Sequence, residues 1–228
     1  MPLDPAAYRL CLVTDRALAR GRPLVEVVMR AVRGGVTMVQ LREKTTTTRA
    51  FLDEARALKG LLADHGVPLI VNDRADIALA VDADGVHVGQ TDLPVEAVRA
   101  MVGPGKLIGL SITDAEQIAR PDAAAADYLG IGPLHPQKTK ADAATPLGLG
   151  GFARLRRLSA KPVLAIGGVK AADVAMLVEE GATGVAVVSA IMAAEDPEAA
   201  ARELVGAWAR EAAGAPRPAA APAPGRNP

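Results

Sequence analysis

The sequence predicts an α/β fold, a single-domain (β/α)8 (TIM) barrel followed by an Ala/Pro-rich C-terminal tail. Short apolar runs alternate with longer stretches of Ala, Leu and charged residues eight times along the chain. Such alternation is typical of parallel strands that are connected by helices. The 228 residues suit one sizeable core, and eight βα units in roughly 200 residues reach the lower size limit of this barrel. A doubly wound open sheet is the alternative, but it would want fewer strands.

The first two strands are expected at 9–14 and 38–43, where short runs are rich in Val and Leu. Such runs favour a strand. The stretches 22–35 and 49–66 carry apolar residues at three- and four-residue spacing, which predicts amphipathic helices. Both stretches end in glycine, a usual helix stop.

The next strands are expected at 68–72, 85–88 and 107–111, again as short apolar runs. A short helical segment lies between the first two of these strands. The stretch 94–103 has helical spacing and ends in glycine, so it predicts the helix before 107–111.

The last strands are expected at 127–132, 162–167 and 184–189. The stretches 170–181 and 197–213 have helical spacing and predict the helices on either side of the final strand. We therefore expect residues 1–213 to form one catalytic barrel domain. Residues 214–228 are mostly Ala and Pro with nothing to bury, which predicts a disordered tail.

Composition narrows the range of partners. Lys+Arg and Asp+Glu both count 26, and aromatic residues make up 2% of the chain. A zero net charge with few stacking platforms argues against a nucleic-acid partner. Cys11 is the only cysteine and lies in an apolar run, so a disulfide within the chain is excluded and a buried thiol is expected. Without a signal sequence or a run of ~18 apolar residues, we expect a cytoplasmic protein with no membrane partner.

Polar residues follow every predicted strand. In a closed barrel the carboxyl ends of all strands converge on one face, so scattered clusters become one pocket. The clusters are Thr14-Asp15, Gln40 to Lys44, Asn72-Asp73, His87 to Asp92, Ser111, Gly132 to Lys140, Gly167-Gly168 and Val188-Ser189.

Two of these clusters favour phosphate binding. Gly167-Gly168 allows backbone N–H groups to approach an anion without a Cβ in the way, and Val188-Ser189 opens a short turn with unpaired N–H groups. This placement after the seventh and eighth strands is where many barrels bind phosphate. Arg42 and Lys44 lie on one face of an extended segment, and such a pair of cations suits a polyanionic ligand.

Asp73 and Asp92 each follow a predicted strand, and neither has an evident ion-pair partner in the sequence. Two carboxylates would repel a polyphosphate unless a cation bridged them, and Mg²⁺ prefers one or two carboxylates with waters and phosphate oxygens. The alternative is that both acids are N-caps, because both precede helical segments.

The remaining polar residues point to no other chemistry. His65 lies at a helix end, His87 in a strand is interpreted as a satisfied core or rim residue, and His135 has no second His or Cys to complete a metal site. The loop 132–148 is too long for an ordinary βα connection, which indicates a functional loop. Motifs of hydrolases and of dinucleotide-binding proteins are missing.

Seven motifs occur in a characteristic order over roughly residues 8–210: "VQLREK", "VNDRADIALAVDADGVHVGQTD", "IGLS", "DYLGIGP", "TKADAATPLG", "AIGG" and "VAVVSAI". In order and spacing they resemble the thiamine-phosphate synthase family. That family transfers an alkyl group in thiamine biosynthesis. It condenses 4-amino-2-methyl-5-(diphosphooxymethyl)pyrimidine with a (carboxy)thiazole ethyl phosphate to give thiamine phosphate and pyrophosphate.

The resemblance also implies a site. Asp73 and Asp92 would hold Mg²⁺, and Ser111 and Lys140 would serve catalysis. The pyrimidine diphosphate would contact Gln40, Leu41, Arg42, Glu43, Lys44, Asn72, Ser111 and Lys140. The thiazole phosphate would lie against Gln137, Lys138, Thr139, Gly168, Val188 and Ser189. Gln137 stands where the family usually has Thr.

Three other functions remain open from the sequence. A thiazole tautomerase of the same barrel type would not need the paired acids or the diphosphate-binding cations. A sugar-phosphate isomerase would want a general acid/base pair, and none is evident. A non-catalytic protein that binds thiamine precursors would release no pyrophosphate. Phosphorylated small molecules are the expected partners, and the sequence leaves open whether the chain forms a homo-oligomer.

Overall fold

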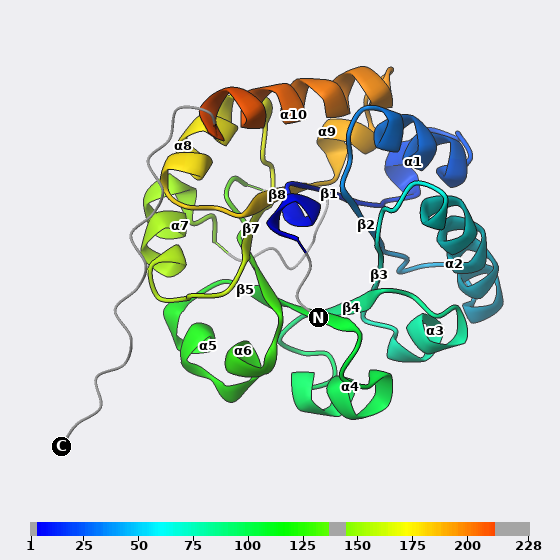
Figure 1. Ribbon diagram of the computed structural model, residues 1–228, viewed down its shortest axis with the longest axis horizontal. Helices are drawn as coiled ribbons and strands as arrows, with labels where there is room; N and C mark the ends of the chain where they lie inside the picture. Colours follow the sequence, from blue (N-terminus) through cyan, green and yellow to red (C-terminus); the bar gives the residue numbers. More distant parts are fainter. Residues whose placement is uncertain (1–3, 137–144, 213–228) are drawn as a thin grey trace.

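A computed structural model describes residues 4–136 and 145–212 of the chain. Within these residues eight parallel strands form a closed barrel in chain order, and the first strand pairs with the last. Helices surround the ring of strands on the outside (Figure 1). The predicted (β/α)8 barrel is therefore confirmed.

The strands are short and lie where the apolar runs predict them, within one or two residues at each end. Their bounds are β1 Leu10–Val13, β2 Met38–Leu41, β3 Leu69–Asn72, β4 Gly85–Val88, β5 Leu107–Ile112, β6 Tyr128–Ile131, β7 Val163–Ile166 and β8 Gly184–Val187.

The five predicted main helices are present, one of them as a 3-10 turn that runs into a helix. The helices are α1 Leu24–Arg33, α2 Thr48–Ala63, α3 Ala75–Ala80, α4 Val95–Val102, α5 Ala115–Ala119, α6 Pro121–Ala125, α7 Gly148–Arg156, α8 Val174–Glu179, α9 Ser189–Met192 and α10 Pro197–Ala212. The 3-10 turns are η1 Pro5–Tyr8, η2 Ala17–Ala19 and η3 Ala171–Asp173. Several of the shorter helices, such as α5 and α9, are too short to show a clear helical period in the sequence.

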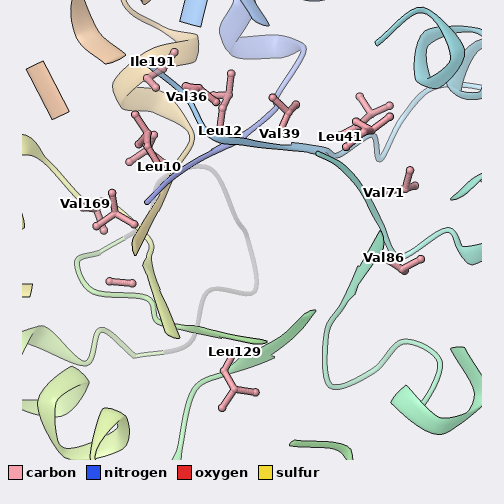
Figure 2. Close-up of a cluster of buried hydrophobic side chains, with 14 of the residues drawn as sticks. Leu10, Leu12, Val36, Val39, Leu41, Val71, Val86, Leu129, Val169 and Ile191 are labelled. Atoms are coloured by element: carbon pink, nitrogen blue, oxygen red, sulfur yellow. The ribbon is translucent and has the colours of Figure 1, made fainter. Parts of the chain in front are cut away.

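Each strand sends alternate side chains to two different cores. Leu12, Val39 and Leu41 point outward from the ring of strands, toward the helices (Figure 2). Met38 and Ile70 belong to a separate buried cluster that fills the barrel interior. The interior is therefore packed with side chains, and ligands can reach only its two ends.

Cys11 lies in the interior cluster and is fully buried, as expected for a structural thiol. Burial raises the pKa of this thiol to about 12, although a hydrogen bond with the Gln40 backbone opposes that shift. The thiol is therefore protonated and unreactive at neutral pH.

The N-terminal turn η1 closes the end of the barrel opposite to the polar clusters. Tyr8 is 2% exposed, and η1 lies across the middle of the ring in Figure 1. A Cβ on Gly184 would overlap the Tyr8 carbonyl, so only glycine allows this close approach. The predicted polar clusters lie at the opposite end, where the strands finish.

The C-terminal helix α10 ends at Ala212 and packs against α1 and α8. The predicted tail, 214–228, lies outside the described residues, and the division into a domain at 1–213 and a tail stays a prediction. Among the helices of the described ranges, none has the length and apolar character needed to cross a bilayer.

Candidate active site at the carboxyl ends of the strands

Asp73 and Asp92 extend from neighbouring strands, as the sequence predicts. Asp73 follows β3 and Asp92 lies in the loop after β4, and these two strands pair directly. The Asp73 N–H donates to the His87 carbonyl, 2.8 Å away, so β4 also fixes the backbone of Asp73. Asp73 adopts a φ of 62°, an uncommon conformation in which Asp and Asn are enriched among non-glycine residues.

The electrostatics of Asp73 show that the two carboxyl groups lie close together. Burial raises the pKa of the Asp73 carboxyl, and both the charge of Asp92 and a hydrogen bond with it act in the same direction. Lys44 opposes the shift through its own hydrogen bond and charge. The Lys44 Nζ lies 2.5 Å from Asp73 Oδ2. The expectation that Asp73 has no ion-pair partner is therefore wrong.

The N-cap alternative for these acids is also wrong. The N-cap of α3 is Arg74 and that of α4 is Pro94. The Asp92 carboxylate accepts the N–H of Gly89 at 2.8 Å, within its own loop. Neither carboxylate caps a helix, so helix capping does not account for their presence at this end of the barrel.

The segment after β2 sends its side chains in two directions. Gln40 is 4% exposed in the barrel, while Leu41 points outward toward the helices (Figure 2). Thr14 holds the backbone beyond the strand, because its hydroxyl accepts the Arg42 N–H at 2.9 Å. Within the described residues the Arg42 guanidinium has no ion-pair partner, which leaves it available to an anion.

Glu43 and Lys44 have different ion-pair partners, since Glu43 lies beside Arg16 and Lys44 beside Asp73. The Glu43 side chain is 2% exposed and lies 3.2 Å from Arg16. Burial raises the pKa of the Glu43 carboxyl, Arg16 opposes this, and Glu54 and Asp15 add to it. The carboxylates of Glu43 and Glu54 share Arg16 as a partner, so Glu43 offers a ligand its main chain only.

Ser111 lies on β5 at the same end and is held from inside the barrel. The His87 Nε2 lies 2.9 Å from Ser111 Oγ, and the His87 Nδ1 lies 3.0 Å from the Tyr128 hydroxyl. His87 is 5% exposed, which confirms its interpretation as a satisfied core residue. Asn72 is 9% exposed, and its strand neighbour across the β3–β4 pair is His87.

The loops after β7 and β8 carry the predicted phosphate-binding residues. Gly167 and Gly168 have φ angles of 93° and 75°, a conformation that glycine adopts without strain. After β8 the chain turns at Val188, and α9 begins at Ser189. Val188 provides no side-chain acceptor for the first N–H groups of that turn.

Four of the predicted site residues lie outside the described residues, namely Gln137, Lys138, Thr139 and Lys140. The chain before them is anchored at β7, and the chain after them is anchored at the segment that follows β6. The Leu134 N–H donates to the Ile166 carbonyl at 2.9 Å, and the Leu147 N–H donates to the Pro133 carbonyl at 2.8 Å.

Sequence reasoning placed His87 among the polar residues at this end of the barrel, but it did not single out Tyr128 or the contact between the two side chains. Their positions along the strands could have placed them on the same side of the sheet. His87 pairs with Asn72 and with Gly109, and Gly109 pairs with Tyr128. Residues paired in this way point to the same side of the sheet. A polar residue in line with Asn72 therefore faces the barrel interior below the site.

The closed barrel, with polar side chains gathered at the carboxyl ends of its strands, defines a TIM-barrel enzyme. A family model described as thiamine monophosphate synthase matches residues 10–191. The chain is 50% identical over 203 residues to a thiamine-phosphate synthase of Syntrophomonas wolfei, an alignment that covers 89% of this chain and 97% of that protein. The chain therefore belongs to the thiamine monophosphate synthase family.

Further relatives agree with this assignment. The thiamine-phosphate synthase of Albidiferax ferrireducens is 50% identical over 198 residues, with 87% of this chain and 90% of that protein covered. The solved thiamine phosphate pyrophosphorylase of Pyrococcus furiosus superposes with a TM-score of 0.83 at 35% identity, over 91% of this chain and 98% of that one. A 3-hexulose-6-phosphate synthase structure, at 22% identity and a TM-score of 0.64, shares the fold.

Proposed function

We propose that the protein is a transferase that forms thiamine phosphate and pyrophosphate from 4-amino-2-methyl-5-(diphosphooxymethyl)pyrimidine and a (carboxy)thiazole ethyl phosphate. The observation that carries the proposal is the cluster of Asp73, Asp92 and Lys44 at the ends of β2, β3 and β4. Two carboxylates and a lysine suit a diphosphate with a bound divalent ion, and so does the nearby Arg42, which has no ion pair within 4–136 and 145–212.

The donor set fits Mg²⁺. Asp73 and Asp92 lie close enough for the charge of Asp92 to raise the pKa of Asp73. Within the described residues no group of three or more His, Cys, Asp or Glu could hold a metal, so the protein offers an ion these two carboxylates only. Mg²⁺ retains several waters and is often bound through one or two carboxylates and substrate phosphates. When bound, it would neutralise charge that develops on the departing pyrophosphate.

The protein's own residues divide into two groups in this proposal. Arg42, Lys44, Asn72, Ser111 and Lys140 hold the pyrimidine diphosphate, and the main chain of Gln40 to Lys44 positions the pyrimidine ring. The thiazole phosphate lies against the backbone of Gly168, Val188 and Ser189, together with Gln137, Lys138 and Thr139.

The chemistry requires a leaving group and an attacking nitrogen. The bond between the pyrimidine methylene and the diphosphate oxygen breaks, and pyrophosphate departs with the electron pair. The thiazole nitrogen then forms a bond to the methylene carbon, and a carboxylated thiazole also loses its carboxyl group as CO₂. Cations aimed at the departing oxygens stabilise this charge, and such preorganised contacts are typically worth ~10²–10³ in rate each. No protein nucleophile is needed.

The test is a reaction with both substrates and the purified chain. We expect pyrophosphate and thiamine phosphate to appear in equal amounts with MgCl₂, and neither product after EDTA or with one substrate omitted. Isomerised thiazole phosphate without pyrophosphate would instead establish a tautomerase. Tight binding of both substrates with no product would establish a binding protein.

The charge of the proposed substrates also indicates in which compartment of the cell the reaction takes place. Both are phosphorylated and charged, and such molecules do not cross a membrane unaided. We therefore infer that the protein works in the cytoplasm, with phosphorylated small molecules as its partners and without nucleic acid. Whether it acts as a homo-oligomer is addressed by measuring its mass in solution.

A further inference from the structure

A line of hydrogen bonds crosses the barrel interior beneath the proposed pyrimidine site. Gln40 on β2 bonds to the Tyr128 hydroxyl on β6. That hydroxyl lies 3.0 Å from His87 Nδ1 on β4, and His87 Nε2 lies 2.9 Å from Ser111 Oγ on β5. The line therefore joins two residues of the site, Gln40 and Ser111, through two buried residues that have no other assigned role.

The barrel makes room for this line at two glycines. A Cβ on Gly109 would overlap both the Tyr128 ring and the His87 ring. A Cβ on Gly130 would come within 3.3 Å of His87 Cε1. The two rings meet with centroids 5.5 Å apart and planes tilted by 44°. The packing thus fixes where both rings lie.

The direction of the hydrogen bonds follows from the number of protons. A neutral imidazole donates from one nitrogen and accepts at the other, and a phenol has one proton to give. Burial raises the pKa of the Tyr128 hydroxyl well above its ordinary value, while Gln40 lowers it. A neighbour that lowers the pKa of a phenol is one that donates to its oxygen. Gln40 therefore donates to Tyr128, and the Tyr128 proton is free to point to His87 Nδ1.

We propose that Tyr128 and His87 are positioning residues that fix the Ser111 hydroxyl as a hydrogen-bond donor to the substrate. Tyr128 donates to His87 Nδ1, which keeps the imidazole proton on Nε2. That proton is donated to Ser111 Oγ, so the Ser111 proton is directed toward the ligand. The proposal rests on the proposed function, because it assigns Ser111 to the pyrimidine diphosphate.

The first test reads the His87 tautomer by long-range ¹H–¹⁵N NMR on the full chain without substrate. The chain has three histidines, and His65→Gln and His135→Gln identify two of them by loss of signal. We expect the remaining ring to carry its proton on Nε2 alone, and Tyr128→Phe to release that preference. A proton on Nδ1, or on both nitrogens, overturns the proposal. This result does not depend on whether the enzyme turns over its substrates.

The second test is a double-mutant cycle on turnover. Tyr128→Phe removes one hydroxyl and keeps the ring, and kcat is expected to fall roughly tenfold, the lower end for residues that orient a ligand-binding side chain. In a Ser111→Ala background the same change should have no further effect, since Tyr128 acts through Ser111. An equal fall in both backgrounds would mean a merely structural role and would overturn the proposal.

Tyr8→Phe is the matched control. It removes the same group from a second buried tyrosine, whose ring centroid lies 5.6 Å from that of Tyr128, at the closed end of the barrel. We expect wild-type kcat and an unchanged His87 tautomer in this variant. If kcat of the wild-type chain were zero with both substrates, the proposed function would fail while the tautomer measurement still decided the hydrogen-bond direction.

Discussion

Lys44 and Asp73 join the ends of β2 and β3 through an ion pair of 2.5 Å between Nζ and Oδ2. Lys44 is half exposed and Asp73 is largely buried, so this lysine neutralises one of the two carboxylates of the proposed metal site. A diphosphate with its metal ion would compete for both partners. The pair therefore links the ends of two neighbouring strands at the proposed site.

Asp73→Asn and Asp92→Asn are expected to abolish most activity and to leave stability unchanged or raised. Neither acid caps a helix, and removing one of two adjacent carboxylates relieves their repulsion. Asn is the right replacement at Asp73, because it also tolerates the φ of 62°. Rates measured against Mg²⁺ concentration, with thermal melts, check this: part of the Asp73→Asn loss should be recovered at high Mg²⁺.

Asp82→Asn is the matched control for these variants. Asp82 also has a positive φ, 53°, and its carboxylate pairs with Lys106, with its side chain 84% exposed. We expect near-normal activity and only a small loss of stability, as for exposed ion pairs. Retained activity with a loss of ~1 kcal/mol in both site variants, the pattern of a lost helix cap, would contradict the metal site.

Ser111→Ala and Lys140→Ala are expected to lower kcat more than they raise KM. Lys140 is assigned from the sequence and its family resemblance, and Ser111 from its place at the end of β5. Loss of one preorganised contact to the departing pyrophosphate costs roughly tenfold to a thousandfold in kcat. Steady-state kinetics with pyrimidine diphosphate varied checks this; a rise in KM alone would make either residue a binding residue only.

Glu43 is expected to give the native protein a stability that falls as pH rises. Its folded-state pKa is above the ordinary 4.5, chiefly through burial, so the native chain keeps this proton where the unfolded chain has released it. The contribution is present in full below the ordinary pKa and is lost as pH rises through the folded-state value. Glu43→Gln should flatten this part of the stability curve, which denaturant unfolding between pH 4 and 8 measures. An unchanged pH dependence would contradict the prediction.

Gly109→Ala is expected to destabilise the barrel, because the new Cβ would overlap Tyr128 and His87. Forcing extra volume into a packed interior typically costs ~1–3 kcal/mol. Gly105→Ala is the matched control, since a Cβ there would meet nothing within 4 Å. Urea unfolding measures the stability of both variants. If Gly109→Ala were as stable as Gly105→Ala, the interior would be able to rearrange around the new Cβ.

Ending the chain after Ala213 is expected to leave the melting temperature and the activity unchanged, because the Ala/Pro composition of 214–228 offers no core contacts. Removing Trp208 as well should destabilise the fold, since this residue of α10 is 8% exposed. A marked fall in melting temperature after the shorter truncation would disprove the predicted tail.

The sequence predicted the strands well because β1 to β8 are short apolar runs between helical segments, and a closed barrel follows from eight such units. The approach of Asp73 and Asp92 was predictable for the same reason, since β3 and β4 are neighbours in the chain and in the sheet. A residue's position along a strand is therefore enough to predict at which end of the barrel it lies.

Contacts that depend on irregular backbone or on several strands at once were not predictable. Lys44 reaches Asp73 from beyond the end of β2, where strand alternation no longer determines direction. The positive φ of Asp73 removes it from the ordinary N-cap geometry. The line from Gln40 to Ser111 requires the register of β2, β4, β5 and β6 together, which no local pattern contains.

The pairing of β1 with β8 has a consequence during synthesis on the ribosome. Cys11 and Leu12 can pair with β2 early, but Leu10 to Leu12 find their β8 partners only when 185–187 have been made. The free edge of β1 therefore stays open until almost the whole barrel has emerged. Open strand edges invite pairing with other chains, and nascent chains that fold late are prone to it. Slowed translation after β7 would therefore lengthen the period of greatest risk of aggregation, whereas the closed ring of β1 to β8 leaves none of these eight strands with a free edge.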